Sequence, residues 1–110
     1  MTVEPHPAQA LGDLVHQRTR LGILTILAES DRADFSYLKE ALALTDGNLG
    51  RHLETLREGG LVDIQKGFVG RRPKTWAIIT TAGKHALAEH VAALREIVDR
   101  VERSTGGHDG

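Results

Sequence analysis

Cysteine is absent from this 110-residue chain, which excludes disulfides, thiolate metal sites and cysteine nucleophiles and fits a reducing compartment. Aromatic residues are scarce as well, at 4% of the chain within a hydrophobic content of 40%. The core must therefore be built from Leu, Ile, Val and Ala. A chain of this length is expected to form one domain with a modest buried surface, so pairing with a second copy would stabilise it.

Signals for secretion, membrane insertion and catalysis are also missing. Residues 1–21 contain no basic segment followed by an apolar run, and no apolar stretch approaches bilayer length. No nucleophile–base set, phosphate-binding loop or paired-carboxylate pocket is visible. We therefore expect a cytoplasmic protein with no membrane partner, no cofactor and no enzymatic activity.

Acidic and basic side chains nearly balance, with a net charge of −1, which by itself argues against a nucleic-acid partner. Their distribution is uneven. Residues 51–84 contain seven basic and three acidic side chains, a net +4, whereas residues 1–50 carry −3 and residues 85–110 carry −2. The positive charge is thus concentrated in the middle of the chain.

Helical periodicity dominates the first half of the chain. Apolar residues predict a helix over residues 9–29, and the polar residues 16–19 could divide it in two. Residues 29–34 are turn-like. Ser36 is placed to cap a short helix that packs Leu42 inward.

A second short helix is predicted after a sharp turn. Thr45 is its expected N-cap, and Leu44 and Leu49 are placed to form a hydrophobic staple across that cap. Gly59 and Gly60 end the helix by C-capping. Two short helices around a sharp turn are the helix-turn-helix unit.

The hydrophobic period then changes to that of strands. Residues 61–79 predict two antiparallel strands joined by the loop GFVGRRPK, residues 67–74. A long helix follows from Thr80 or Thr81. The fold class is therefore mainly α (α+β): a winged helix-turn-helix with a two-stranded wing hairpin and a long C-terminal dimerisation helix. The predicted organisation is a disordered tail at residues 1–8, one domain at residues 9–103 and a second disordered tail at residues 104–110.

The helix after Thr45 contains two glycines, each of which costs a helix up to about 1 kcal/mol relative to Ala. On a helical wheel, Gly47 and Arg51 point away from the leucines of the buried side. A recognition helix contacts base edges from its N-terminal part, where Asn suits adenine and Arg suits guanine. Glycines would let the backbone approach DNA closely, and Asp46 is interpreted as a residue that favours the helix dipole. The predicted contact residues are Thr45, Gly47, Asn48, Gly50, Arg51 and His52.

Structural alternatives exist for each of these features. The glycines could simply mark a weak helix, and His52 could fill the helix edge instead of reaching a phosphate.

The hairpin cations Lys66, Arg71, Arg72 and Lys74 give +4 over nine residues with no acid among them. They suit a phosphate track or a minor groove, although an arginine pair can also be an ordinary solvated loop. Trp76 is expected to pack on the core rather than to stack on bases.

Metal binding is only weakly suggested. His85 and Glu89 share a helix face by their four-residue spacing, and His90 is displaced by about 100°. A metal site usually needs more donors than this, so no metal site is predicted.

The last helix carries the signal for self-association. Its apolar residues alternate at spacings of four and three, the pattern of a coiled-coil seam. Part of this seam could cover the domain's own core, but its length favours a homodimer, to which the leading helix could contribute. The predicted interface residues are Leu87, Val91, Leu94, Val98, Val101, Leu11 and Leu14.

Residues 14–87 resemble a known family. The segments LVHQRTRLGILTILAE, DFSYLKEALALTDGNLGRHLETLREGGLVDIQKGF and GRRPKTWAIITTAGKHAL are similar to single-domain bacterial winged helix-turn-helix regulators of the MarR/ArsR-like group. The phrases LTDGNLxxHLxxLxxxGLV and FxGRRPxT carry most of the likeness. The resemblance implies double-stranded DNA binding, a homodimer and transcriptional regulation, and it leaves room for an unidentified small-molecule effector.

The sequence therefore predicts a sequence-specific regulator that binds a near-palindromic operator as a homodimer. Repression by occluding a promoter is the expected mechanism, since the chain has no room for an activation domain. Two alternatives stay open: a winged-helix protein-interaction module without DNA binding, and an ArsR-like sensor of a metal or small ligand.

Overall fold

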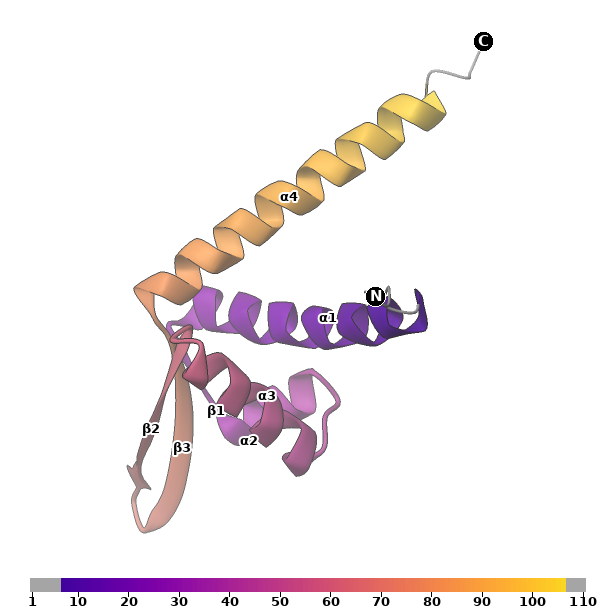
Figure 1. Ribbon diagram of the computed structural model, residues 1–110. Helices are drawn as coiled ribbons and strands as arrows, with labels where there is room; N and C mark the ends of the chain where they lie inside the picture. The colour runs from indigo at the N-terminus through magenta and orange to yellow at the C-terminus, as the bar shows by residue number, and fades with distance from the viewer. Residues whose placement is uncertain (1–6, 107–110) are drawn as a thin grey trace, which may run out of the picture.

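The computed structural model describes the backbone of residues 7–106 and the side chains of residues 17–106. Apart from one additional short strand, its elements follow the predicted order and confirm a mainly helical winged helix-turn-helix fold (Figure 1). They are α1 (Pro7–Ser30), β1 (Arg32–Asp34), α2 (Phe35–Ala41), α3 (Asp46–Glu58), β2 (Val62–Val69), β3 (Arg72–Ile79) and α4 (Thr81–Gly106). No helix among these described residues is long and apolar enough to cross a membrane.

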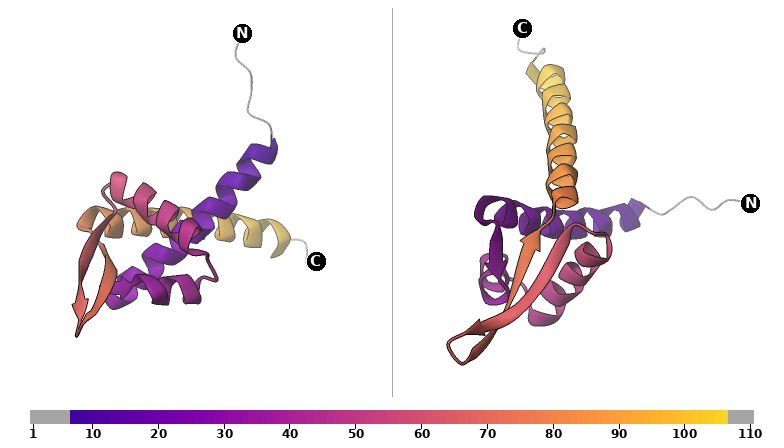
Figure 2. Two further views of the ribbon diagram at one scale, coloured as in Figure 1. Left: turned by 90° about the horizontal axis from the view of Figure 1, so that it is seen from below. Right: turned by 90° about the vertical axis from the view of Figure 1, so that its left-hand side faces the viewer.

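The elements are arranged around α1. In Figure 1, α1 lies between α4 above it and the pair α2 and α3 below it. The hairpin of β2 and β3 extends from the body on the side opposite α4, and the second view in Figure 2 shows the same arrangement. The N-terminal end of α3 and the tip of the hairpin therefore lie on one side of the molecule, and α4 projects from the other.

The core is aliphatic, as the scarcity of aromatics predicts. It joins α1, α2, α3 and one face of the sheet, and fully burying each Leu, Ile or Val contributes about 1.5–3 kcal/mol. Its members are Ile23, Leu24, Leu27, Ala33, Leu38, Leu49, Leu53, Leu56, Val62, Ala77 and Ile79. Leu44 packs against this core, to which Leu49 belongs, as expected for a hydrophobic staple.

The sheet has three strands rather than the predicted two, in the order β1-β3-β2. Residues 32–34, predicted to be part of a turn, form β1 and pair antiparallel with β3, with Arg32 opposite Ile78 and Asp34 opposite Trp76. Three residues are too few to show a strand period in the sequence. Pairing with β3, some 40 residues away, decides their conformation.

The predicted cap of α2 is wrong by two residues. Asp34, extended at φ −79° and ψ 158°, caps the helix, and its Oδ1 accepts the N–H of Tyr37 at 2.8 Å. Ser36 lies inside the helix. This backbone hydrogen bond, aided by the nearby Lys74 ammonium and opposed by partial burial, lowers the pKa of Asp34.

Several predicted boundaries also shift. The eight-residue hairpin loop is a two-residue turn, because Val69 pairs with Arg72 and only Gly70 and Arg71 lie between the strands. Gly70 has φ 63°, which fits the first central position of a type II′ turn. Helix α1 starts at Pro7 and runs unbroken through residues 16–19, and α4 includes residues 104–106.

Candidate nucleic-acid interface

The first turn of α3 is capped as predicted. The Thr45 Oγ1 accepts the N–H of Asn48 at 3.1 Å, and the Thr45 backbone is extended. Asp46, in this same turn, pairs with the Lys39 ammonium of α2 at 3.0 Å. This ion pair reduces the repulsion that Asp46 would exert on a phosphate, so the positive end of the helix dipole stays available to an anion.

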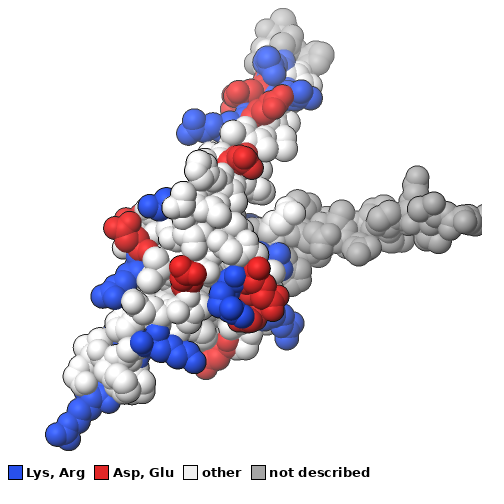
Figure 3. Space-filling model, turned by 60° about the vertical axis from the view of Figure 1, so that its left-hand side comes forward, with Lys and Arg blue, Asp and Glu red and all other residues white. Residues whose placement is uncertain are grey.

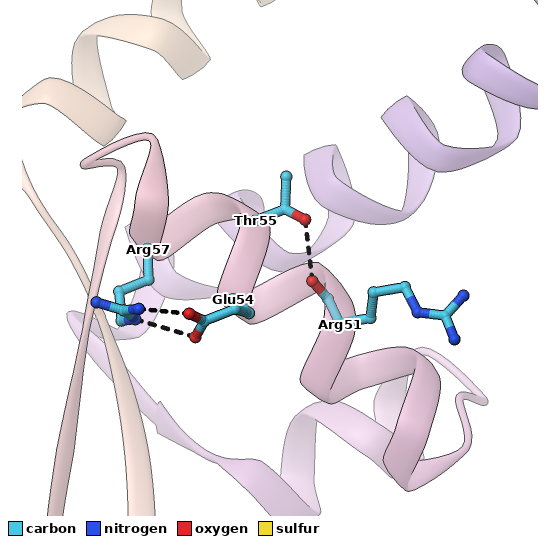
Figure 4. A network of polar contacts seen from close by, with 4 residues as sticks. All are labelled: Arg51, Glu54, Thr55 and Arg57. Atoms are coloured by element: carbon cyan, nitrogen blue, oxygen red, sulfur yellow. Dashed lines mark hydrogen bonds and ion pairs between the residues drawn. The ribbon is translucent and has the colours of Figure 1, made fainter.

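The outward side of α3 is thin. A Cβ built on Gly47 or Gly50 would meet nothing within 4 Å. Asn48 and Arg51 are exposed on the same helix, and the Arg51 side chain extends away from the helix body (Figure 4). The Thr55 hydroxyl donates to the Arg51 carbonyl at 3.1 Å. Nothing within the described residues requires glycine at these two positions, whereas close approach of an external surface would.

His52 does not share that outward side. It is 8% exposed, and its neighbour Leu53 belongs to the core. Of the six residues predicted to contact DNA from this helix, His52 is the one that the fold turns inward. Its burial favours the alternative in which it fills the helix edge.

The structure contains an ion pair on α3 that was not predicted from the sequence. Arg57 Nε donates to Glu54 Oε2 at 3.0 Å, and Arg57 Nη2 donates to Glu54 Oε1, as Figure 4 shows. The hydrogen bonds from Arg57 lower the pKa of Glu54, and Glu54 raises the pKa of Arg57. The three-residue spacing of opposite charges was the available signal. The pair keeps an ionised carboxylate beside the outward face of α3 while balancing its charge.

The wing carries its cations near the tip. Lys66, Arg71 and Arg72 are exposed, and Figure 3 shows basic side chains without acidic ones at the end of the hairpin, at lower left. Lys74 differs from the other three, because its ammonium lies 3.3 Å from Asp34 Oδ2. The predicted +4 is therefore reduced by an acid from β1, which sequence spacing could not reveal.

Trp76 lies outside the aliphatic core, contrary to the prediction. Alternation along β3 puts it on the face opposite Ala77, which is a core residue. The Arg32 guanidinium lies 4.7 Å from its ring centroid, and a Cβ on Gly67 would come within 3.0 Å of the ring. Trp76 thus packs between a cation and a glycine on the outer face of the sheet.

The apolar seam of α4 divides in two. Leu87 packs against the domain's own core, so part of the seam serves the single chain. Beyond it the seam is solvent-exposed, as is the neighbouring Ile97. The exposed seam residues are Val91, Leu94, Val98 and Val101. The side chains of Leu11 and Leu14 lie outside the described residues.

The base of α4 is joined to the end of α3. The Leu61 N–H donates to the Leu56 carbonyl at 2.9 Å and the Gly60 N–H donates to the Arg57 carbonyl at 3.0 Å, which together form a Schellman end. The Thr80 hydroxyl donates to the Gly60 carbonyl at 2.6 Å and accepts the Gly83 N–H at 2.9 Å. The two helices therefore share one hydrogen-bonded junction.

A cavity of about 250 Å³ lies between α1, α3 and α4. Leucines make up much of its wall, with Arg20 and His90 as its basic side chains. Within residues 17–106, no group of three or more His, Cys, Asp or Glu side chains gathers in a way that could hold a metal ion. A ligand for the cavity stays a prediction.

Comparison with known proteins gives consistent matches. The family model of the winged helix DNA-binding domain matches residues 19–98. An uncharacterized protein from Methanocaldococcus jannaschii is 37% identical over 83 residues, which cover 76% of this chain and 90% of that protein.

Solved structures show the same fold. A transcriptional regulator homologue from Pyrococcus horikoshii OT3 is 33% identical, with a TM-score of 0.72, and the match covers 77% of this chain and 84% of that one. A PadR-like transcription factor from Bacteroides fragilis is 18% identical, with a TM-score of 0.76, and the match covers 86% and 97% of the two chains. This second likeness concerns the fold alone.

Proposed function

The chain belongs to the winged helix DNA-binding domain family and is a DNA-binding transcription regulator, and we propose that it acts as a homodimeric repressor on a near-palindromic operator. Repression would follow from occupying a promoter. The regulator would bind DNA in the cytoplasm and would catalyse no reaction. The narrower placement among bacterial MarR- and ArsR-like regulators stays a prediction.

The open face at the start of α3 carries this proposal. Gly47 and Gly50 have free space where a Cβ would be, and Arg51 is exposed beside them. A helix with so thin a face suits a major groove, which its N-terminal residues would enter. The wing tip lies on the same side of the molecule (Figure 1), where its cations would reach the flanking backbone or minor groove.

The exposed seam of α4 supports the homodimer. Val91, Leu94, Val98 and Val101 are 37–55% exposed in the single chain. Such a row is the kind of surface that a second copy covers. Pairing of two α4 helices about a twofold axis would present two α3 helices to half-sites about 34 Å apart or at a multiple of that spacing.

Selection of bound duplexes followed by footprinting tests the proposal. We expect a dyad-symmetric sequence with two protected half-sites, and affinity that weakens steeply with salt. Binding of equal strength to every duplex would contradict sequence-specific regulation. The absence of any duplex binding would favour a protein-interaction module.

Leu94→Glu tests the dimer within that proposal. A carboxylate at the seam should dissociate the homodimer in sedimentation, since burying it unpaired costs several kcal/mol, roughly 2–7 kcal/mol for even a neutral polar group. DNA affinity should then fall by roughly 100-fold or more, because two half-sites are no longer held together.

Arg103→Gln is the matched control, because it changes the charge by the same amount away from the seam, and it should stay dimeric. A wild-type protein that sediments as a monomer would contradict the dimeric mechanism. So would a Leu94→Glu protein that binds DNA like the wild type.

A further inference from the structure

Among the side chains of residues 17–106, Phe68 is the most exposed large hydrophobic one, at 71%. It lies near the end of β2, two residues before the hairpin turn, and pairs with Pro73 of β3. The fold does not need an aromatic side chain at this position, because Phe68 does not contribute to the core cluster. Phe68 is thus an apolar side chain that the fold leaves open to an external partner.

The direction of Phe68 follows from strand alternation. Val62, Ile64, Lys66 and Phe68 lie on one face of β2, and Val62 is fully buried against the helices. Phe68 therefore projects on the face of the hairpin that is continuous with the core face, toward the side of α2 and α3. Val69 projects to the opposite face, beside its pair Arg72.

The charge around Phe68 identifies the class of partner. Residues 64–80 contain no acidic side chain. Lys66 lies on the same face of β2 as Phe68, and Arg71 follows in the hairpin turn. An apolar side chain in the basic outer part of the hairpin complements a polyanion that also offers an apolar surface. Duplex DNA has both, in its phosphates and in its sugars and base steps.

From this arrangement we propose that Phe68 is an apolar wedge that the wing places in the minor groove next to each half-site. The inference rests on the proposed DNA-binding function and adds a specificity determinant to it. Apolar wedges unstack a base step partially, and pyrimidine–purine steps such as TA yield most easily. Phe68 would thus make the regulator sensitive to the deformability of flanking base pairs, while α3 reads the half-site.

The test compares four full-length proteins on the selected operator: wild type, Phe68→Ala, Val69→Ala and Arg71→Ala. Each binds two duplexes that differ only in the flanking step under the wing, TA in one and AA in the other. We expect Phe68→Ala to lose roughly 10-fold in affinity or more on the TA duplex, in line with the strength of contacts between a base and an aromatic side chain. The preference of the wild type for TA should disappear in this variant, and Val69→Ala should keep it.

Salt dependence separates the wedge from a phosphate contact. Arg71→Ala should lower the salt slope by about one unit, whereas Phe68→Ala should leave it unchanged, because an apolar contact releases no counterion. A 2-aminopurine in the flanking step should brighten on binding of the wild type but not of Phe68→Ala, as unstacking requires.

The possible results distinguish failure of the wedge from failure of the proposed function. A wild type that binds no duplex overturns the proposed function and the wedge with it. A wild type that binds, together with a Phe68→Ala protein that keeps its affinity and its TA preference, overturns the wedge alone. Reduced self-association of Phe68→Ala in sedimentation would assign Phe68 to a contact between copies and would also overturn the wedge.

Discussion

The first turns of α3 and α4 are built alike. Each begins with a threonine N-cap, and each cap accepts the N–H of the residue three positions later: Asn48 for Thr45 and Gly83 for Thr80. Each turn also contains a glycine, Gly47 in α3 and Gly83 in α4. From the sequence alone, the two turns carry the same signals.

Their glycines have opposite surroundings. A Cβ on Gly47 would meet nothing within 4 Å, whereas a Cβ on Gly83 would overlap the Leu61 carbonyl and lie 2.8 Å from Ile79 Cγ1. Gly83 is needed because the chain itself approaches closely. Gly47 leaves space that the described chain does not use. A glycine that the fold does not need, on an outward face of a helix, points to a surface supplied from outside.

Gly83→Ala gives the largest expected effect in this comparison. The added methyl group would press on backbone at the junction of α3 and α4, and overpacking of this kind costs about 3 kcal/mol. Chemical denaturation at fixed protein concentration should show that loss. Gly47→Ala is the matched substitution and should stabilise the protein by up to about 1 kcal/mol, since Ala favours a helix. Equal effects of the two variants would show that the two glycines do not differ as described.

The sequence predicted the parts of the fold that depend on local signals. The helix period, the Thr45 cap and the change to strands were sufficient to predict the helix-turn-helix and its wing. The leucines of α3 also predicted its buried side correctly. Short elements were missed where a distant partner decides the conformation, as for β1, which exists because β3 pairs with it.

The candidate site was predictable to a similar degree. Gly47, Gly50, Asn48 and Arg51 lie outward as expected, since helix geometry alone determines which residues share a face. The Asp34–Lys74 ion pair was not predictable, because 40 residues separate its members. Gly83 was missed because a glycine in the first turn of a helix carries no signal of crowding.

Gly47→Leu sharpens the comparison on the side of function. The leucine would occupy the open face of α3 and should lower operator affinity by about 100-fold or more, which is at least about 2.7 kcal/mol. The domain should stay folded, because the added side chain meets only solvent in the free protein. Binding measured by fluorescence anisotropy, with thermal unfolding of the same samples, checks both statements. Normal operator binding by this variant would remove the close-approach explanation of Gly47.

The smallest expected effect comes from a substitution at the start of a third helix, α2, whose N-cap residue also contacts the wing. Asp34 caps α2 and also pairs with Lys74. Asp34→Asn keeps the cap, because Asn and Asp cap helices about equally well, but it removes the charge that restrains Lys74. Stability at neutral pH should change by about 0.5 kcal/mol or less, as expected for loss of a partly exposed ion pair.

The DNA affinity of Asp34→Asn should rise, whereas a variant that damages the interface would bind DNA more weakly. A released Lys74 would add a phosphate contact, so the affinity of Asp34→Asn should rise a few-fold and its salt slope should steepen by up to about one unit. The pH dependence of stability provides a second check. The folded-state pKa of Asp34 is lowered, so its contribution is present above the unfolded pKa of about 3.9 and is lost as pH falls through the folded pKa. Asp34→Asn should lack that part of the acid-induced loss of stability. If its salt slope matches that of the wild type, Lys74 does not reach DNA even when released, and the wing contact is confined to the residues nearer the tip.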